Sequence, residues 1–100
     1  MANRFTLSKK AVLDIKAITL KSLEDFGFPQ TDKYVIGMKT TLQLLADERI
    51  VGKEFNNKEA GRVYFHYRYV SHTIFYRRRK NDILIVRVLH KRMLPENHLS

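Results

Sequence analysis

Apolar positions in the first half of the chain recur at intervals of three and four residues, the period of an amphipathic helix. Between Lys9 and Phe26 the recurring apolar residues are Ala11, Val12, Ile15, Ile18, Leu23 and Phe26. Ser8 stands before this run as an N-cap, and Gly27 follows it as the residue type that commonly ends a helix. The pattern therefore predicts a first helix over residues 9–26.

The same period continues after a link of only a few residues. The apolar set is Tyr34, Val35, Met38, Leu42 and Leu45. Pro29 suits the beginning of a helix, and the period ends at about Asp47. A link this short predicts two antiparallel helices that bury facing stripes, and we expect Gly37 to mark their close approach.

Outside the helices the pattern is weaker or changes its period. Residues 5–7 alternate between apolar and polar, which predicts a short first strand. Residues 49–61 have no clear period and contain two Gly and two Asn, so we predict a surface loop there.

After Gly61 the period changes to two, which indicates β-strands. Residues 62–68 alternate between Val63, Phe65 and Tyr67 on one face and Arg62, Tyr64, His66 and Arg68 on the other. A second strand is predicted over residues 71–77, followed by a charged turn. Residues 83–89 are almost wholly apolar, as in a central strand or one covered on both faces.

These elements define the expected architecture. Their order is β-α-α-β-β-β, a helical hairpin packed on a three- to four-stranded antiparallel sheet, in the α+β class. At 100 residues the chain has the size of a single domain with one core, spanning residues 1–100.

Composition narrows the chemistry and the compartment. The chain has no Cys, so neither a disulfide framework nor a thiolate zinc site is possible. No apolar run approaches the roughly 20 residues of a membrane span, and the first residues lack the apolar stretch of a signal peptide. We expect a protein of the cytoplasm without a membrane partner.

Charge is unevenly distributed along the chain. The net charge is +9, and residues 1–50 carry 8 basic and 6 acidic side chains against 11 and 4 in residues 51–100. The positive field therefore lies on the predicted sheet. Nucleic acid, an RNA–protein particle and an acidic protein are all compatible partners.

Several local strings resemble the ParE branch of the ParE/RelE toxin superfamily of bacterial toxin–antitoxin operons. The most specific are Ser71-His72-x-Ile74-Phe75-Tyr76-Arg77 and Ile85-Val86-Arg87-Val88-Leu89-His90-x-x-Met93, and helical strings such as Ser8-x-x-Ala11-x-x-Asp14-Ile15 agree with them. The resemblance implies a RelE/ParE-like fold and a toxin that inhibits DNA gyrase by binding it. It also implies neutralisation by a ParD-like antitoxin, no cofactor, and contact with operator DNA only through the antitoxin.

Site residues follow from placing these partners on the predicted sheet. For the target we select the charged turn and the segment after the last strand, namely Arg77, Arg78, Arg79, Lys80, His90, Lys91, Arg92 and Met93. For the antitoxin we select Tyr34, Met38, Arg62, Tyr64 and His72. The basic turn has two readings, since it can bind phosphates or simply be a solvated hairpin tip that resists edge-to-edge pairing.

Three alternatives stay open. A ribosome-dependent mRNA endonuclease of the RelE type needs a base, cations and an acid, for which the candidates are His90, Arg92, Arg62 and Tyr76. The aromatic and basic residues of the sheet can also stack on nucleic acid, although alternation sends about half of them to the core. In the third alternative the chain is a toxin relic, retained only because it binds the antitoxin or a DNA site.

The four His lack metal-ligand spacing, so no metal is expected.

Overall fold

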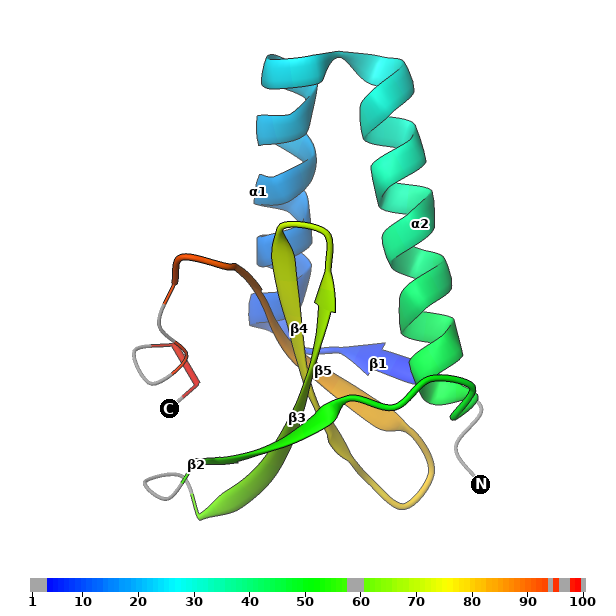
Figure 1. The fold of residues 1–100 in the computed structure, drawn as a ribbon, viewed down its shortest axis with the longest axis vertical. Helices are drawn as coiled ribbons and strands as arrows, with labels where there is room; N and C mark the ends of the chain where they lie inside the picture. The colour runs from blue at the N-terminus through cyan, green and yellow to red at the C-terminus, as the bar shows by residue number, and fades with distance from the viewer. Residues whose placement is uncertain (1–3, 58–60, 94, 96–97, 100) are drawn as a thin grey trace.

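The computed structural model describes residues 4–57, 61–93, 95 and 98–99. Figure 1 shows a helical hairpin that rises from one twisted sheet. In chain order the elements are β1 (Phe5–Leu7), α1 (Lys9–Phe26), α2 (Phe28–Ala46), β2 (Lys53–Asn57), β3 (Arg62–Tyr69), β4 (His72–Arg78) and β5 (Ile83–His90). The α+β class is confirmed.

The predicted helix signals act as expected. The Ser8 side-chain oxygen accepts a hydrogen bond from the Ala11 N–H at 3.0 Å, which satisfies one of the unpaired donors of the first turn. Gly27 has φ +82°, and its N–H donates to the Leu23 carbonyl oxygen at 3.1 Å. This one residue links the two helices, because glycine tolerates the left-handed conformation.

The sheet differs from the prediction in its number of strands. Five strands lie in the order β1-β5-β4-β3-β2, with β1 parallel to β5 and the other neighbours antiparallel. The fifth strand is β2, which lies inside the segment that we predicted as a loop. It has no apolar period of its own, because it is an edge strand held by backbone pairing with the next strand, β3.

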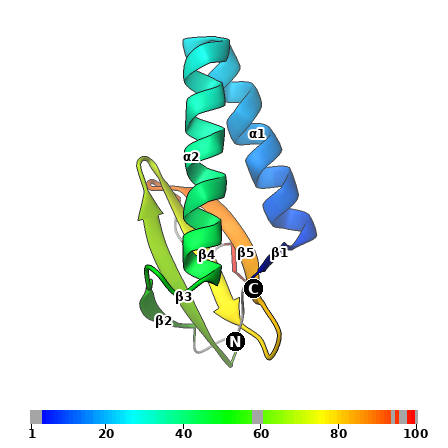
Figure 2. The same ribbon diagram turned by 90° about the vertical axis from the view of Figure 1, so that its right-hand side faces the viewer.

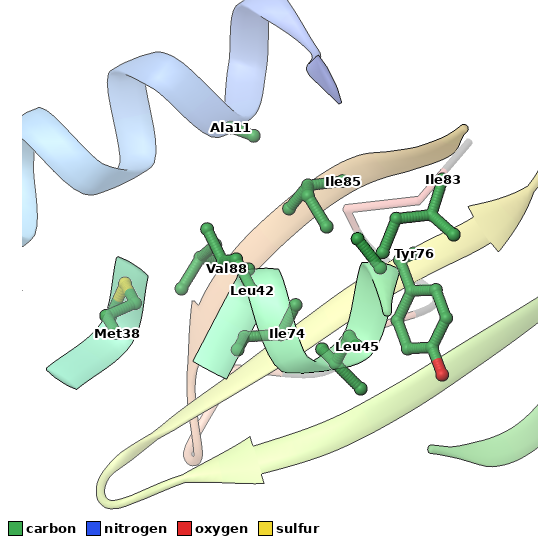
Figure 3. Packing of buried hydrophobic residues seen from close by; sticks show 10 residues of the cluster. Ala11, Met38, Leu42, Leu45, Ile74, Tyr76, Ile83, Ile85 and Val88 are labelled. Carbon is green, nitrogen blue, oxygen red and sulfur yellow. The ribbon is translucent and has the colours of Figure 1, made fainter. Parts of the chain in front are cut away.

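The helices lie on one face of the sheet (Figure 2) and bury the main core there. This core, part of which is drawn in Figure 3, comprises Ala11, Met38, Leu42, Leu45, Ala46, Ile74, Tyr76, Ile83, Ile85 and Val88. A smaller second core lies on the opposite face, which we call the open face. It comprises Tyr64, Phe75, Leu89 and Leu99, so Leu99 covers part of that face.

Gly37 marks a close approach as predicted, but the predicted partner, the first helix, was wrong. A Cβ at this position would overlap the hydroxyl group of Tyr69 from β3, so the close approach joins α2 to the sheet and not to α1. The Tyr69 hydroxyl donates to the Tyr34 carbonyl oxygen at 2.9 Å. Gly37 therefore makes room for a tyrosine that fastens α2 to the end of β3.

Helix α1 covers the edge of β5 beyond the three residues paired with β1. The Ser8 hydroxyl donates to the Val86 carbonyl oxygen at 2.7 Å, and Asp14 accepts a hydrogen bond from the Val88 N–H at 3.0 Å. These contacts satisfy backbone groups that a sheet edge otherwise leaves open. Neither helix is both long and apolar enough to cross a membrane within the described part of the chain.

Candidate binding surfaces

A cluster of rings lies where the β3–β4 turn meets α2. The Tyr34 hydroxyl oxygen lies 2.6 Å from His72 Nδ1, and the His72 and His90 rings meet edge to face with centroids 5.4 Å apart. Tyr34 and Tyr69 also contact each other, with centroids 5.0 Å apart. The first residues of β4 are thereby tied to both α2 and the last residue of β5.

This cluster forms one wall of a cavity of about 420 Å³, which we call the hairpin cleft. Its lining includes Ile18, Phe26, Tyr34, Val70, His72 and His90. Phe26 and Val70 stand at its border with 61% and 66% of their surface exposed. Val70 also has φ +51°, a strained value for a β-branched residue. The cleft thus offers apolar surface beside polar ring atoms.

The pKa values of two rings in this cluster are shifted toward the uncharged form. Burial, and then the charge of His90, lower the pKa of His72, while burial raises the pKa of Tyr34. A neutral His72 can accept a hydrogen bond from the Tyr34 hydroxyl at Nδ1. Such a cluster suits binding through apolar contact and hydrogen bonds.

The residues predicted to bind the antitoxin are not all on the surface. Tyr34 and His72 line the hairpin cleft, but Met38 belongs to the main core and Tyr64 to the second core. Arg62 is exposed at the far end of β3. Met38 and Tyr64 are therefore not accessible to a partner, because the side chain of Met38 faces the main core and that of Tyr64 faces the second core.

The residues predicted to bind the target separate into two groups. Arg77, Arg78, Arg79 and Lys80 lie at the β4–β5 turn, whereas His90, Lys91, Arg92 and Met93 lie at the other end of β5. β5 has 8 residues, so at about 3.3 Å per residue the groups are roughly 23 Å apart. They do not form one compact patch.

The turn itself is held by its own charges. Arg79 Nε donates to Asp82 Oδ1 at 2.7 Å, and hydrogen bonds from Arg79 and Thr6 lower the pKa of Asp82 to about 2. The Arg78 guanidinium lies 4.9 Å from the centre of the Phe65 ring and 3.8 Å from a Glu48 carboxylate oxygen. Much of the positive charge of this turn is therefore already partnered.

The predicted ribonuclease residues do not converge. His90 and Arg92 lie at one end of the sheet and Arg62 at the other. Tyr76 is 2% exposed, and its hydroxyl accepts a hydrogen bond from the Gly52 N–H at 2.9 Å. No group of three or more His, Asp or Glu that could hold a metal occurs among residues 4–57 and 61–93.

A second cavity, which the sequence analysis did not predict, lies on the open face. We call it the open-face cleft; its volume is about 270 Å³, and its lining includes Phe55, His66, Arg68, Phe75, Lys91 and Met93. The alternation in residues 62–68 already placed His66 and Arg68 on one face. Phe55 and Lys91 could not be added, because they come from β2 and from the segment after β5.

The fold and these surfaces define a small basic α+β domain with two clefts and no assembled catalytic group among the predicted residues. The family of the ParE toxin of the type II toxin–antitoxin system parDE matches residues 5–95. The Toxin ParE1 of Caulobacter vibrioides is 30% identical over 96 residues, which cover 96% of this chain and 97% of that protein.

A solved structure supports the fold. The chain resembles one in the chromosomal ParDE TA system from P. aeruginosa with a TM-score of 0.72 and 15% identity, covering 87% of this chain and 94% of that one. The chain belongs to the ParE toxin family of type II toxin–antitoxin systems. The resemblance noted from the strand strings is therefore confirmed.

Proposed function

We propose that this toxin acts by binding and inhibiting DNA gyrase and that a ParD-like antitoxin neutralises it. The observation that carries the proposal is the family match, which runs through both helices and all five strands. The scattered positions of His90, Arg92, Arg62 and Tyr76 support action by binding without covalent chemistry.

The charged surfaces suggest how the target is held. The β4–β5 turn and the segment His90–Met93 are two separate contacts, roughly 23 Å apart along β5. A large enzyme such as gyrase can span both, whereas a small ligand cannot. The protein acts in the cytoplasm without a cofactor, and it meets operator DNA only through its antitoxin.

A gyrase supercoiling assay tests the target. The purified toxin should inhibit supercoiling, and addition of the antitoxin encoded beside its gene should restore it. Intact supercoiling together with mRNA cleavage in a ribosome-containing translation assay would replace gyrase inhibition with the ribonuclease activity. Unimpaired growth during expression of a folded product would instead indicate a relic toxin.

A further inference from the structure

Four exposed cations of the sheet half take part in no ion pair within the described part of the chain. They are Lys53, Arg62, Arg68 and Lys91. The guanidinium groups of Arg78, Arg79 and Arg87, by contrast, each have a carboxylate partner. Much of the free positive charge of the sheet is therefore carried by these four residues.

The sheet places these cations on its open face, and we call them the open-face row. Arg62 and Arg68 share the face of Tyr64 in β3, because side chains two residues apart in a strand point the same way. Lys53 of β2 stands directly opposite His66 of β3, so it lies on that face too. Lys91 lines the open-face cleft together with Arg68.

The middle of the row is held in place and strongly positive. Arg68 Nε donates to Thr73 Oγ1 at 3.2 Å, which orients the guanidinium. Burial, and then the charges of Lys53 and Arg68, lower the pKa of His66, so two cations act on one ring. No Asp or Glu occurs among the described lining residues of the cleft to offset them.

The length of the row suits an extended polyanion. Arg62 and Arg68 lie at the two ends of β3, and six residues at about 3.3 Å each separate them by roughly 20 Å. A small anion cannot contact both. Each strand of a DNA duplex carries one negative charge per roughly 3.4 Å of helix axis, so several phosphates fit along this length.

Buried rings favour a duplex over a single strand or a peptide. Tyr64 and Phe75, the rings between the cations, are each only 4% exposed. Bases therefore cannot stack on them as they do in single-strand binding proteins, and a peptide cannot use them as the aromatic anchors of an interface. Binding through phosphates alone suits a duplex, whose bases are already paired.

We propose that the open-face row binds the phosphates of double-stranded DNA, with one phosphate between Arg68 and Lys91 at the cleft and others at Lys53 and Arg62. The inference rests on the proposed function in one respect, because it takes this DNA to be the duplex on which gyrase acts. The toxin then contacts both the enzyme and its substrate. Phosphates carry no sequence information, so the contact does not select operator DNA.

DNA binding is first measured without gyrase, by fluorescence anisotropy of a short duplex at several salt concentrations. R62Q/R68Q/K91Q removes three cations of the row, and K10Q/K16Q/K33Q removes three exposed lysines of the helices. Affinity should fall at least about tenfold for R62Q/R68Q/K91Q and stay within about threefold for K10Q/K16Q/K33Q. The slope of log affinity against log salt should fall by about 3 for R62Q/R68Q/K91Q alone. Circular dichroism checks that both variants are folded.

A titration of His66 followed by NMR locates the contact in the wild-type protein. Phosphates at the row offset the charges of Lys53 and Arg68, so the duplex should raise the pKa of His66. An unchanged pKa in the DNA-bound toxin would place the DNA elsewhere on the molecule and overturn the proposal.

Three outcomes of the binding measurements would also overturn it. The wild-type toxin does not bind the duplex, or the two variants lose the same affinity, which would reflect net charge only. In the third, polyglutamate of equal charge binds more tightly than the duplex and loses its binding in R62Q/R68Q/K91Q, which would make the row a site for an acidic protein.

The supercoiling assay separates this inference from the proposed function. A wild-type toxin that binds DNA at the row but leaves supercoiling intact refutes gyrase inhibition and keeps the DNA site. A toxin that inhibits supercoiling without binding DNA refutes the DNA site alone. Where both hold, R62Q/R68Q/K91Q should inhibit about tenfold more weakly than the wild type, and K10Q/K16Q/K33Q within about twofold. Full inhibition by R62Q/R68Q/K91Q would refute a role of the DNA contact in inhibition.

Discussion

Asp14 of α1 and Arg87 of β5 form a two-bonded ion pair between elements 73 residues apart in sequence. Arg87 Nε and Nη2 donate to the two carboxylate oxygens at 2.7 and 2.8 Å, and the same carboxylate accepts the Val88 N–H. Arg87 also donates to the His98 carbonyl oxygen at 3.1 Å. The Asp14 carboxylate thus joins the first helix to the edge of β5, and Arg87 extends this contact to His98.

Replacing Asp14 should therefore destabilise the fold. Both side chains of the pair are 14% exposed, so Asp14→Ala leaves a largely buried guanidinium and a strand N–H without their acceptor. We expect the free energy of unfolding, measured by urea denaturation, to fall by about 3 kcal/mol. Asp25→Ala, which breaks the exposed pair with Lys21, should change it by less than about 1 kcal/mol. Equal effects would contradict the role assigned to Asp14.

Gly37→Ala tests the close approach of α2 to β3. The added methyl group would overlap the Tyr69 hydroxyl, so we expect a loss of about 1–3 kcal/mol in place of the gain that alanine usually gives in a helix. The variant G37A/Y69F should recover part of this loss, because the overlapping oxygen is removed. Thermal unfolding measures the stability of both variants. If G37A/Y69F is no more stable than G37A, the loss does not come from overlap with the Tyr69 hydroxyl.

Stability should depend on pH through two histidines. The pKa values of His66 and His72 are lowered in the folded protein, so protons bind the unfolded chain more readily. Their contribution is present above the unfolded pKa of about 6.5 and is lost as the pH falls through the folded values. Urea unfolding at about pH 7.5 and about pH 5.5 should show lower stability at the lower pH, and H66N/H72N should flatten the difference. A difference that persists in H66N/H72N would assign it to other groups.

A charge in the main core should unfold the protein. Ile85 is 0% exposed, and an unpaired carboxylate there costs several kcal/mol against a total stability of about 5–15 kcal/mol. Ile85→Asp should abolish the cooperative thermal transition, and Val88→Asp should do the same. Leu13→Asp on α1, at a position 63% exposed, should stay folded. A folded Ile85→Asp variant would be incompatible with this core.

The β4–β5 turn can be tested by removing its charges, with circular dichroism to check that each variant is folded. R78Q/R79Q/K80Q removes exposed side chains and should weaken gyrase inhibition about tenfold if the turn contacts the target. K9Q/K10Q/K16Q removes the same charge from α1 and should leave inhibition within about twofold. If folded R78Q/R79Q/K80Q inhibits gyrase as strongly as the wild type, the turn does not contact the target and is only a solvated hairpin tip.

Site prediction was limited by distance along the chain. The period of two placed His66 and Arg68 on one face, but it did not predict the open-face cleft that these residues help to line. It could not show that Lys91 joins them, nor that the turn and the segment after β5 are far apart. Burial of Met38 and Tyr64 also depends on what packs above each face, which periodicity alone does not specify.

By itself the sequence determined the two helices and their ends, because the Ser8 cap, the Gly27 stop and the apolar period act within a few residues. It also determined most strand positions and the family. Only the tertiary structure decided the strand β2, the parallel pairing of β1 with β5, the contact of Gly37 with Tyr69 and the pair of Asp14 with Arg87. The last three features join segments far apart in the chain, and β2 depends on the backbone of β3, so their energies appear only when the sheet and helices have assembled.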